Sequence, residues 1–334
     1  MRCLLWVECT MDNIVDFKKS LLRIIGRQGR FKWEDNYLAG IYAVPGEAPK
    51  GSRICRLNSR KLGRALHLLS TPERIFAQLA LYNPDVFELH EQKMLSPVPQ
   101  VHPLQGNPLA AGLKLLPVKG TSLVAEEIGL KHATVVVTYV DGERQRVPHP
   151  YLGDLLLYIQ PQGSVPYAVN WTVKLSAMDF DEVARGGLKS LAKQKENREK
   201  ARLRHALEEI YYHSAGIRTV RVSRDLLDPV LVANLDLLYG FHDREISLDS
   251  NLLEDFSHDI EDCVAHGRPV ASVALMYGQR WGRRDLFLAK IYKDIWERKL
   301  PVSLFDPILI DHPLVTDAAD VMQVYGSLFA GLPE

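Results

Sequence analysis

The sequence predicts an α/β protein with a mixed central sheet flanked by helices, followed by a mainly α C-terminal domain. Two observations predict this class. Up to residue 228, short runs rich in β-branched and aromatic residues alternate with helical periods. Beyond it, the pattern becomes almost entirely helical. We therefore expect two domains, 1–228 and 229–334, which suits a chain of 334 residues.

The first expected element is an amphipathic helix over residues 12–26. Its apolar face would carry Ile14, Phe17, Leu21, Leu22 and Ile25. Residues 53–69 come next and predict two short strands joined by a turn at Gly63.

A helix signal follows in "STPERIFAQLALY". Ser70 suits the N-cap, Pro72 suits the first turn, and Glu73 takes the third helical position, as in a capping box. Residues 84–95 alternate enough between apolar and polar side chains to predict a strand.

The middle of the chain is punctuated by proline and glycine. Five prolines between Pro97 and Pro117 predict an irregular segment. A short helix is expected over 121–129, where Gly129 closes it. The stretch "ATVVVTYVDGERQRV" then predicts a strand with a turn at its Asp-Gly pair.

Residues 151–176 read "YLGDLLLYIQPQGSVPYAVNWTVKLS" and predict a hairpin of two apolar strands across a Gly/Pro turn. The first strand opens on Asp154, and the second is interrupted by Lys174. A long helix is expected over 187–213, ending near Gly216, and "IRTVRVSRD" predicts the strand after it.

The C-terminal domain should contain several helices and one strand pair. The helical segments are "PVLVANLDLLYGF", "SNLLEDFSHDIEDCVAHG", "VASVALMYGQRWG" and "RDLFLAKIYKDIWERK". The strand pair is expected in "LPVSLFDPILID". Short helices, a basic helix and a trailing hairpin are typical of a winged-helix-like module that binds DNA or a partner. A small helical bundle that packs or docks explains the same pattern.

Composition narrows the class of protein. The chain is 46% hydrophobic and 25% charged, as in an ordinary globular protein. It has no run of 18 apolar residues, so we expect no membrane span. Its cysteines are Cys3, Cys9, Cys55 and Cys263. None has metal or redox spacing, and such sparse use fits a reducing cytoplasm.

The formal net charge of zero hides a segregation of charges. Residues 18–32 carry six basic and no acidic side chains, and 184–204 carry eight basic and two acidic. Residues 242–262 instead carry eight acidic and one basic. Each run alone is best explained as a solvated helix face, but several basic runs together favour a nucleic-acid partner.

Three polar residues of the first domain form a combination capable of chemistry. If Glu73 packs near the hairpin, it and Asp154 supply hard oxygen ligands for Mg²⁺. Lys174 would then stabilise charge on a phosphoryl group and orient or deprotonate the attacking water. This is the logic of PD-(D/E)xK nucleases. The simpler explanations are a cross-strand salt bridge between Asp154 and Lys174 and a helix-capping role for Glu73.

Longer motifs add a resemblance to a family. The segment from Ser59 to Pro97 resembles the signature of the TnsA family, the endonuclease subunit of heteromeric (Tn-seven-like) cut-and-paste DNA transposases. That signature has a Ser-x-x-x-Gly-Arg turn, a His-x-Leu-Ser segment with a Glu three residues later, and a downstream Arg/His-Glu-Gln. The matching residues are Ser59, Gly63, Arg64, His67, Leu69, Ser70, Glu73, His90, Glu91 and Gln92, followed by Gly129, Lys131, His132, Asp154 and Lys174.

The resemblance implies a Mg²⁺-dependent endonuclease with a restriction-endonuclease-like core that cuts the 5′ strands at transposon ends, with Mn²⁺ as a substitute. Glu73, Asp154 and Lys174 would be catalytic. Metal ligands would be Glu73, Asp154, Thr172 and Val173, with Glu91 and His67 supporting them from behind. Candidate DNA contacts are Arg64, Lys189, Lys193, Arg284 and Lys290.

The resemblance also implies partners: double-stranded DNA, an integrase-like transposase subunit of the TnsB type and an AAA+ ATPase regulator of the TnsC type, in the bacterial cytoplasm at the nucleoid. The acidic residues 242–262, with Asp255 and Asp259, suit docking to a basic partner surface.

The family pattern is not complete. Where the family usually has Gln, this chain has Thr172, and Trp171 brings a bulky ring next to it. A non-catalytic assembly or DNA-bridging subunit and a stand-alone restriction-like nuclease therefore remain alternatives.

Overall fold

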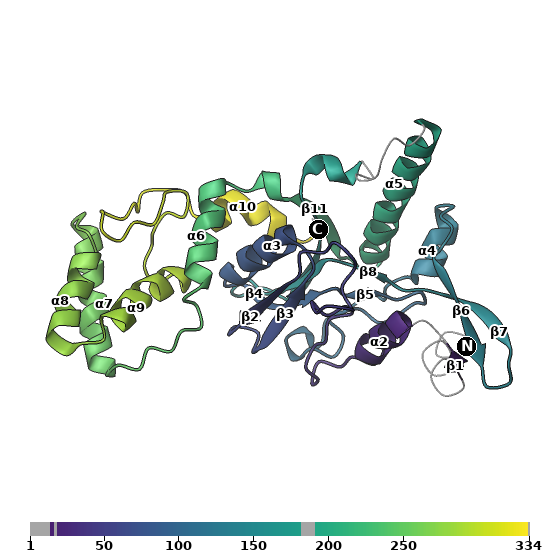
Figure 1. The fold of residues 1–334 in the computed structure, drawn as a ribbon, viewed down its shortest axis with the longest axis horizontal. Helices are drawn as coiled ribbons and strands as arrows, with labels where there is room; N and C mark the ends of the chain where they lie inside the picture. The colour runs from purple at the N-terminus through teal and green to yellow at the C-terminus, as the bar shows by residue number, and fades with distance from the viewer. Residues whose placement is uncertain (1–13, 17–18, 182–190, 333–334) are drawn as a thin grey trace. The chain divides into compact units, whose positions relative to one another are not determined.

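The computed structural model describes residues 14–16, 19–181 and 191–332 (Figure 1). The chain forms two compact units. The first comprises Met1–Ala77, Pro84–Asp225 and Leu328–Glu334, and the second Gln78–Asn83 and Leu226–Ser327. The main division lies close to the boundary expected at residue 228. Two short segments were not expected where they are: Gln78–Asn83 belongs to the second unit and Leu328–Glu334 to the first. Nothing in the local sequence marks where a helix passes from one unit to the other.

The first unit is built on a four-stranded sheet in the order β11-β10-β9-β4. The expected central hairpin forms the antiparallel pair of β9 (Leu155–Ile159) and β10 (Tyr167–Lys174). β4 (Val86–Glu91) pairs antiparallel with β9, whereas β11 (Arg218–Ser223) pairs parallel with β10. The sheet is therefore mixed, as expected for this α/β protein.

Side chains of β10 alternate between the two faces of this sheet, because successive residues of a strand point to opposite sides. Trp171 lies on one face, fully buried against Phe76 and Phe329, and its Nε1–H donates to the carbonyl of Leu328 at 2.8 Å. The expectation that Trp171 stands beside the catalytic groups is therefore corrected. Its neighbours Thr172 and Lys174 share the opposite face.

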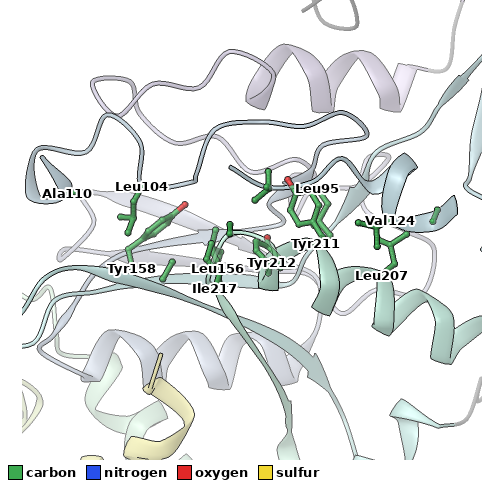
Figure 2. Packing of buried hydrophobic residues seen from close by; sticks show 14 residues of the cluster. Leu95, Leu104, Ala110, Val124, Leu156, Tyr158, Leu207, Tyr211, Tyr212 and Ile217 are labelled. Atoms are coloured by element: carbon green, nitrogen blue, oxygen red, sulfur yellow. The ribbon is translucent and has the colours of Figure 1, made fainter. Parts of the chain in front are cut away.

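That opposite face is covered by α5 (Leu191–His213), which connects β10 to the parallel strand β11. Figure 2 shows the sheet residues Leu156 and Tyr158 and the helix residues Leu207 and Tyr211 in one apolar cluster. The expected N-terminal part of this helix, 187–190, lies outside the described residues. Its end is confirmed, with Gly216 in the left-handed conformation at φ +76°.

The strand pair expected before the first catalytic candidate is confirmed. β2 (Cys55–Ser59) and β3 (Arg64–Leu68) pair antiparallel, and Gly63 turns the chain at φ +64°. α3 (Thr71–Tyr82) follows at once. The helix begins where predicted, and the Oγ of Ser70 accepts from the N–H of Glu73 at 3.3 Å.

The middle segment contains smaller elements. β5 (Met94–Leu95) pairs with β8 (Tyr151–Leu152), and the proline-rich stretch is irregular apart from the 3₁₀ turn η1 (Pro108–Ala110). α4 (Thr121–Glu127) ends before Gly129 at φ +69°. β6 (Thr134–Tyr139) and β7 (Arg144–Pro148) form a hairpin around the expected Asp-Gly turn. Two further 3₁₀ turns are η2 (Ala177–Phe180) and η3 (Arg224–Leu226).

The helix expected at 12–26 is wrong at its start. Residues 14–16 form β1 (Ile14–Asp16), which pairs with β6, and α2 (Lys19–Gln28) begins only afterwards. Residues 12, 13, 17 and 18 lie outside the described part. Pairing with a strand more than 100 residues away overrides the local helical period.

The second unit is helical. Its main helices are α6 (Pro229–Tyr239), α7 (Ser250–Ala265), α8 (Ala271–Trp281), α9 (Arg284–Trp296) and most of α10 (Val321–Phe329). The strand pair expected in "LPVSLFDPILID" is wrong, since residues 226–327, all described, contain no strand. Pro301 and Pro307 lack the N–H groups that a ladder needs. Without that hairpin there is no wing, and the helical bundle describes this unit.

No helix in the described ranges is long and apolar enough to cross a membrane.

Candidate active site

The three residues proposed for catalysis meet at one pocket of the first unit. The pocket has a volume of about 850 Å³, and Glu73, Asp154 and Lys174 all line it. Glu73 comes from the first turn of α3, Asp154 precedes β9, and Lys174 ends β10. The N-terminus of a helix and the adjoining ends of two antiparallel strands thus bring together residues that are far apart in sequence.

Glu73 is held by several donors at the start of α3. Its Oε2 accepts from the N–H of Leu69 at 2.8 Å and from Nε2 of Gln92 at 3.0 Å. Its Oε1 accepts from the hydroxyl of Ser70 at 2.8 Å. The side chain is only 7% exposed, so its orientation is fixed by these bonds.

The same burial perturbs the protonation of Glu73. Desolvation, followed by the negative charge of Asp154, raises the pKa of Glu73 to about 7. The hydrogen bonds from Leu69 and Ser70 and the positive charge of Lys174 act in the opposite direction. Two carboxylates that repel each other in a pocket form a site that favours a cation.

Asp154 is oriented by the strand beside it. Its Oδ2 accepts from the backbone N–H of Val173 at 2.7 Å, and its own carbonyl accepts from the N–H of Gln92 at 3.0 Å. The N–H and C=O of one strand residue point to the same edge. The carbonyl of Val173 therefore points to the side of the strand on which Asp154 lies, where it was expected to bind metal.

The simple salt-bridge explanation of the hairpin is wrong. Within the described residues, no ion pair within 4.0 Å joins Lys174 to Asp154 or to another carboxylate. The ammonium of Lys174 is half-buried at the pocket and is an electrostatic neighbour of Glu73 and Glu208. It therefore remains available to a ligand.

The lining of the pocket also includes charges that the sequence analysis missed. The segment from Pro49 to Arg53 lines the pocket, and the side chains of Lys50 and Arg53 are exposed. Neither forms an ion pair with a carboxylate in the described ranges. Asp179 also lines the pocket. No motif marks residues 49–53, so only the fold reveals their position.

Thr172 lies behind the pocket and is not among its lining residues. Its hydroxyl donates to Oε1 of Glu208 at 3.2 Å, and Nδ2 of Asn170 donates to the same oxygen at 2.9 Å. Glu208, from α5, is buried, and burial raises its pKa, with Arg204 opposing the shift. Glu208 was missed because nothing in the sequence distinguishes it from the other glutamates of α5.

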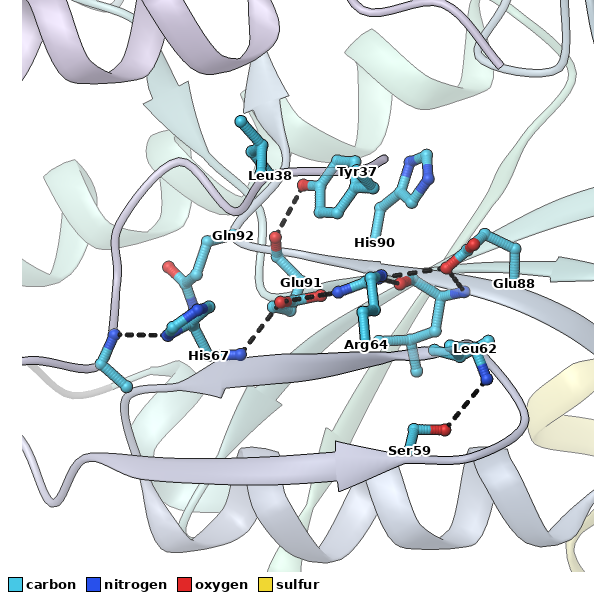
Figure 3. Close-up of polar contacts among 12 residues, drawn as sticks. Tyr37, Leu38, Ser59, Leu62, Arg64, His67, Glu88, His90, Glu91 and Gln92 are labelled. Carbon is cyan, nitrogen blue, oxygen red and sulfur yellow. Dashed lines mark hydrogen bonds and ion pairs between the residues drawn. The ribbon is translucent and has the colours of Figure 1, made fainter. Parts of the chain in front are cut away.

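Glu91 and His67 belong to a separate hydrogen-bond network that includes Arg64 and Glu88 (Figure 3). Arg64 donates to both oxygens of Glu91, at 3.0 and 3.1 Å, and also to Glu88. The N–H of His67 donates to Oε1 of Glu91 at 2.9 Å. The guanidinium of Arg64 is occupied by these carboxylates, which removes Arg64 from the candidate DNA contacts.

The other basic candidates lie in different surroundings. Lys189 lies outside the described residues. Lys193 is exposed on α5 and pairs with Glu196 at 2.9 Å. Arg284 is exposed at the start of α9. Lys290 is largely buried, bonded to Ser257 and paired with Asp294, which removes it from the candidate phosphate contacts.

The donors in the pocket fit a hard cation. Two carboxylates, of Glu73 and Asp154, face it, and the Val173 carbonyl points to their side. Mg²⁺ usually binds one or two carboxylates and completes its shell with water and substrate phosphate. No cluster of three or more His, Cys, Asp or Glu suited to a metal occurs in the described ranges.

Neither the known protein-family models nor the curated proteins give a match to this chain.

Proposed function

We propose that this chain is a divalent-metal-dependent DNA endonuclease, and that it acts as the TnsA-like subunit that cuts the 5′ strands at transposon ends. The observation that carries the proposal is the convergence of Glu73, Asp154 and Lys174 on one pocket. The family motif that includes His90, Glu91 and Gln92 adds the specific role. A restriction-endonuclease-like core is part of the same proposal, and the mixed sheet is compatible with it.

In this proposal Glu73 and Asp154 hold the cation, with the Val173 carbonyl as a further ligand; Thr172 stays a candidate ligand. A bound Mg²⁺ or Mn²⁺ would polarise a phosphoryl oxygen and lower the pKa of a water. Lys174 forms no ion pair with a carboxylate of the described residues. It orients the attacking water and stabilises the negative charge that builds on the phosphoryl oxygens.

The exposed cations Lys50 and Arg53 are suited to the phosphates that flank the scissile bond. Such contacts set register and carry little sequence information. Lys50 and Arg53, which form no ion pair with a carboxylate of the described residues, line the same pocket as the carboxylates of Glu73 and Asp154. Such a lining suits an anionic substrate that is bound through a cation.

The remaining partners follow from the resemblance. We propose an integrase-like transposase that processes the 3′ strands and an AAA+ regulator. In the second unit, α7 exposes Glu254 and Asp255, whereas Asp259 accepts from the hydroxyl of Tyr277 at 2.8 Å. An exposed acidic helix face suits a basic protein surface better than DNA.

The test is strand-specific mapping of cuts on DNA that carries a transposon end, with and without partner proteins. Wild type with Mg²⁺ should cut the 5′ strand, Ca²⁺ should permit binding only, and Asp154→Ala should reduce cutting by at least about a thousandfold, since it removes a ligand and a charge. Asp317→Ala is the matched acidic control, because Asp317 is exposed, lies outside the pocket lining and is not on α7, and this variant should cut like wild type.

Cutting by Asp154→Ala at the wild-type rate would rule out the assignment, as would robust cutting in chelator. Cutting without any partner would favour a stand-alone nuclease. A complex that yields only 3′ nicks would favour the assembly subunit, for which the capture of the Thr172 hydroxyl by Glu208 is the supporting observation.

A further inference from the structure

Gln92 makes direct contacts with both carboxylate-bearing residues of the pocket. Its backbone N–H donates to the carbonyl of Asp154 at 3.0 Å. Its side-chain Nε2 donates to Oε2 of Glu73 at 3.0 Å. Gln92 is 4% exposed, so water does not compete for these bonds. One residue thus links the strand that carries Asp154 to the side chain of Glu73.

The backbone of Gln92 has a conformation that few side chains adopt. Its φ is +51°, in the left-handed region, which costs a non-glycine residue free energy. This turn directly after β4 lets the N–H and the side-chain amide reach two different residues. Such a conformation persists only where the surroundings fix it.

Two donors from the N-terminal part of the chain hold that conformation. Nε2 of Gln28, at the end of α2, donates to the Gln92 carbonyl at 3.1 Å, and the N–H of Gly40 donates to the same oxygen at 3.1 Å. The Oε1 of Gln28 also accepts from the N–H of Met94. At Gly40, a Cβ would stand 2.7 Å from the Gln92 oxygen, so only glycine permits this approach.

We propose that Gln92 is a positioning residue for the proposed cleavage: its amide fixes the Glu73 carboxylate relative to Asp154, so that both face one cation. The inference rests on the proposed function. Gln92 is bonded to the Glu73 carboxylate and is not part of the pocket lining, so it acts through Glu73 and does not touch the substrate. Its removal should therefore weaken cation binding and slow turnover without changing the affinity for DNA.

Two variants separate this role from a structural one. Gln92→Met keeps the length and volume of the side chain but lacks the donor. Gln92→Gly also lacks the donor, yet adopts a positive φ freely. Gln92→Met should lower the thermal stability of the protein, and Gln92→Gly should lower it less, because glycine is not strained at a positive φ. If Gln92 positions Glu73, both variants should lose cation affinity to the same extent. If its role is only structural, the loss of cation affinity should be larger in the less stable variant.

The measurement is a calorimetric titration of the full chain with Mn²⁺, in parallel with cleavage kinetics in Mg²⁺. We expect both variants to bind Mn²⁺ on the order of 10–100-fold more weakly than wild type, the size typical for partners of metal ligands. kcat should fall by a similar factor, while KM for DNA stays within about twofold. Mn²⁺ affinity within about twofold of wild type in both variants would overturn the inference.

The proposed function fails if wild type does not bind Mn²⁺, or if Asp154→Ala binds it as tightly as wild type. A second measurement, made without metal, tests the role of Gln92 independently of that result. In a double-mutant cycle on urea unfolding, Gln92→Met should raise the unfolding constant on the order of tenfold more in the wild-type background than in the Glu73→Ala background. Only in the wild-type background does the substitution leave the buried Glu73 carboxyl group without the donor of Gln92. Additive effects of the two substitutions would refute the link between the residues whatever the metal results.

Discussion

Glu73 shows how one side chain serves both folding and the proposed chemistry. At the third position of α3 it looks like an ordinary capping carboxylate, and it does accept from the N–H of Leu69. Yet capping normally stabilises the charged form of an acid, and the pKa of Glu73 is raised to about 7. Burial and the charge of Asp154 outweigh the cap, so the helix terminus alone does not explain this residue.

The raised pKa predicts a pH-dependent stability. Between the usual carboxyl value of 4.5 and about 7, the folded state binds more protons than the unfolded state at Glu73. The contribution of Glu73 to the free energy of unfolding is therefore fully present below about pH 4.5 and is lost as the pH rises through about 7. A cation needs the ionised form, so Mn²⁺ should bind about tenfold more tightly at pH 8 than at pH 6.

Calorimetry at the two pH values checks this expectation. Glu73→Gln should bind Mn²⁺ weakly at both pH values, and its affinity should differ much less between pH 6 and pH 8 than that of wild type. Glu91→Gln is the control, because burial also raises the pKa of Glu91 to about 7 although Glu91 pairs with Arg64 and lies outside the pocket lining. That control should keep the wild-type difference. Equal Mn²⁺ affinity at pH 6 and pH 8 in wild type would contradict the role of Glu73.

At the scale of elements, the central hairpin explains why a buried region carries charged residues at its ends. β9 is entirely buried and β10 nearly so, which leaves Asp154 and Lys174 at the border where the strands open to the pocket. Asp154 and Lys174 form no ion pair with each other, and Asp154 accepts a hydrogen bond from the N–H of Val173 instead. Neither charge forms an ion pair within the described residues, and such an arrangement costs stability and is typical of a functional site.

Two glycines of the N-terminal elements provide a matched stability prediction. Gly40→Ala should destabilise the protein by about 1–3 kcal/mol, because the new Cβ would lie 2.7 Å from the Gln92 carbonyl and 2.8 Å from Leu152. Gly26→Ala, inside α2 with no atom within 4 Å, should stabilise it by roughly 0.5–1 kcal/mol. Urea unfolding of both variants measures the difference, and a neutral Gly40→Ala would show that residues 40 and 92 are not closely packed.

At the scale of the molecule, the zero net charge conceals regions of opposite sign. The first unit carries the pocket with its exposed Lys50 and Arg53, and the second carries the acidic face of α7. Screening limits such fields to about 10 Å, so each charged surface acts mainly on a molecule that touches it. The segregation is consistent with a chain that contacts both DNA and other proteins.

The salt dependence of DNA binding tests this division. If Lys50 and Arg53 each contact a phosphate, replacing both by alanine should lower the slope of log K against log salt by about 2 and weaken binding to all sequences alike. The control is Lys114→Ala with Lys119→Ala, which removes the same charge outside the pocket lining. An unchanged slope in the first double variant, or an equal loss in both, would exclude a specific role for residues 50 and 53.

The sequence by itself determined most of the local elements of this protein, the exceptions being β1, α10 and the strand pair expected at residues 300–311. The turn at Gly63, the start of α3 at Ser70, the central hairpin and the four helices after residue 228 all follow from caps, turns and periodicity. It also identified Glu73, Asp154 and Lys174 as a possible set, through residue chemistry and a family resemblance.

Only the tertiary structure decided what depends on contacts between distant segments. The pairing of β1 with β6, the burial of Trp171, and the positions of Lys50, Arg53 and Glu208 around the site carry no local signal. The sequence marks Gln92 through the family motif but not its hydrogen bonds to Glu73 and Asp154. The reason is physical: periodicity and capping act over a few residues, whereas a pocket is made where a helix terminus, a strand end and a loop meet. Their side-chain charges and hydrogen bonds are set by neighbours that the local sequence does not contain.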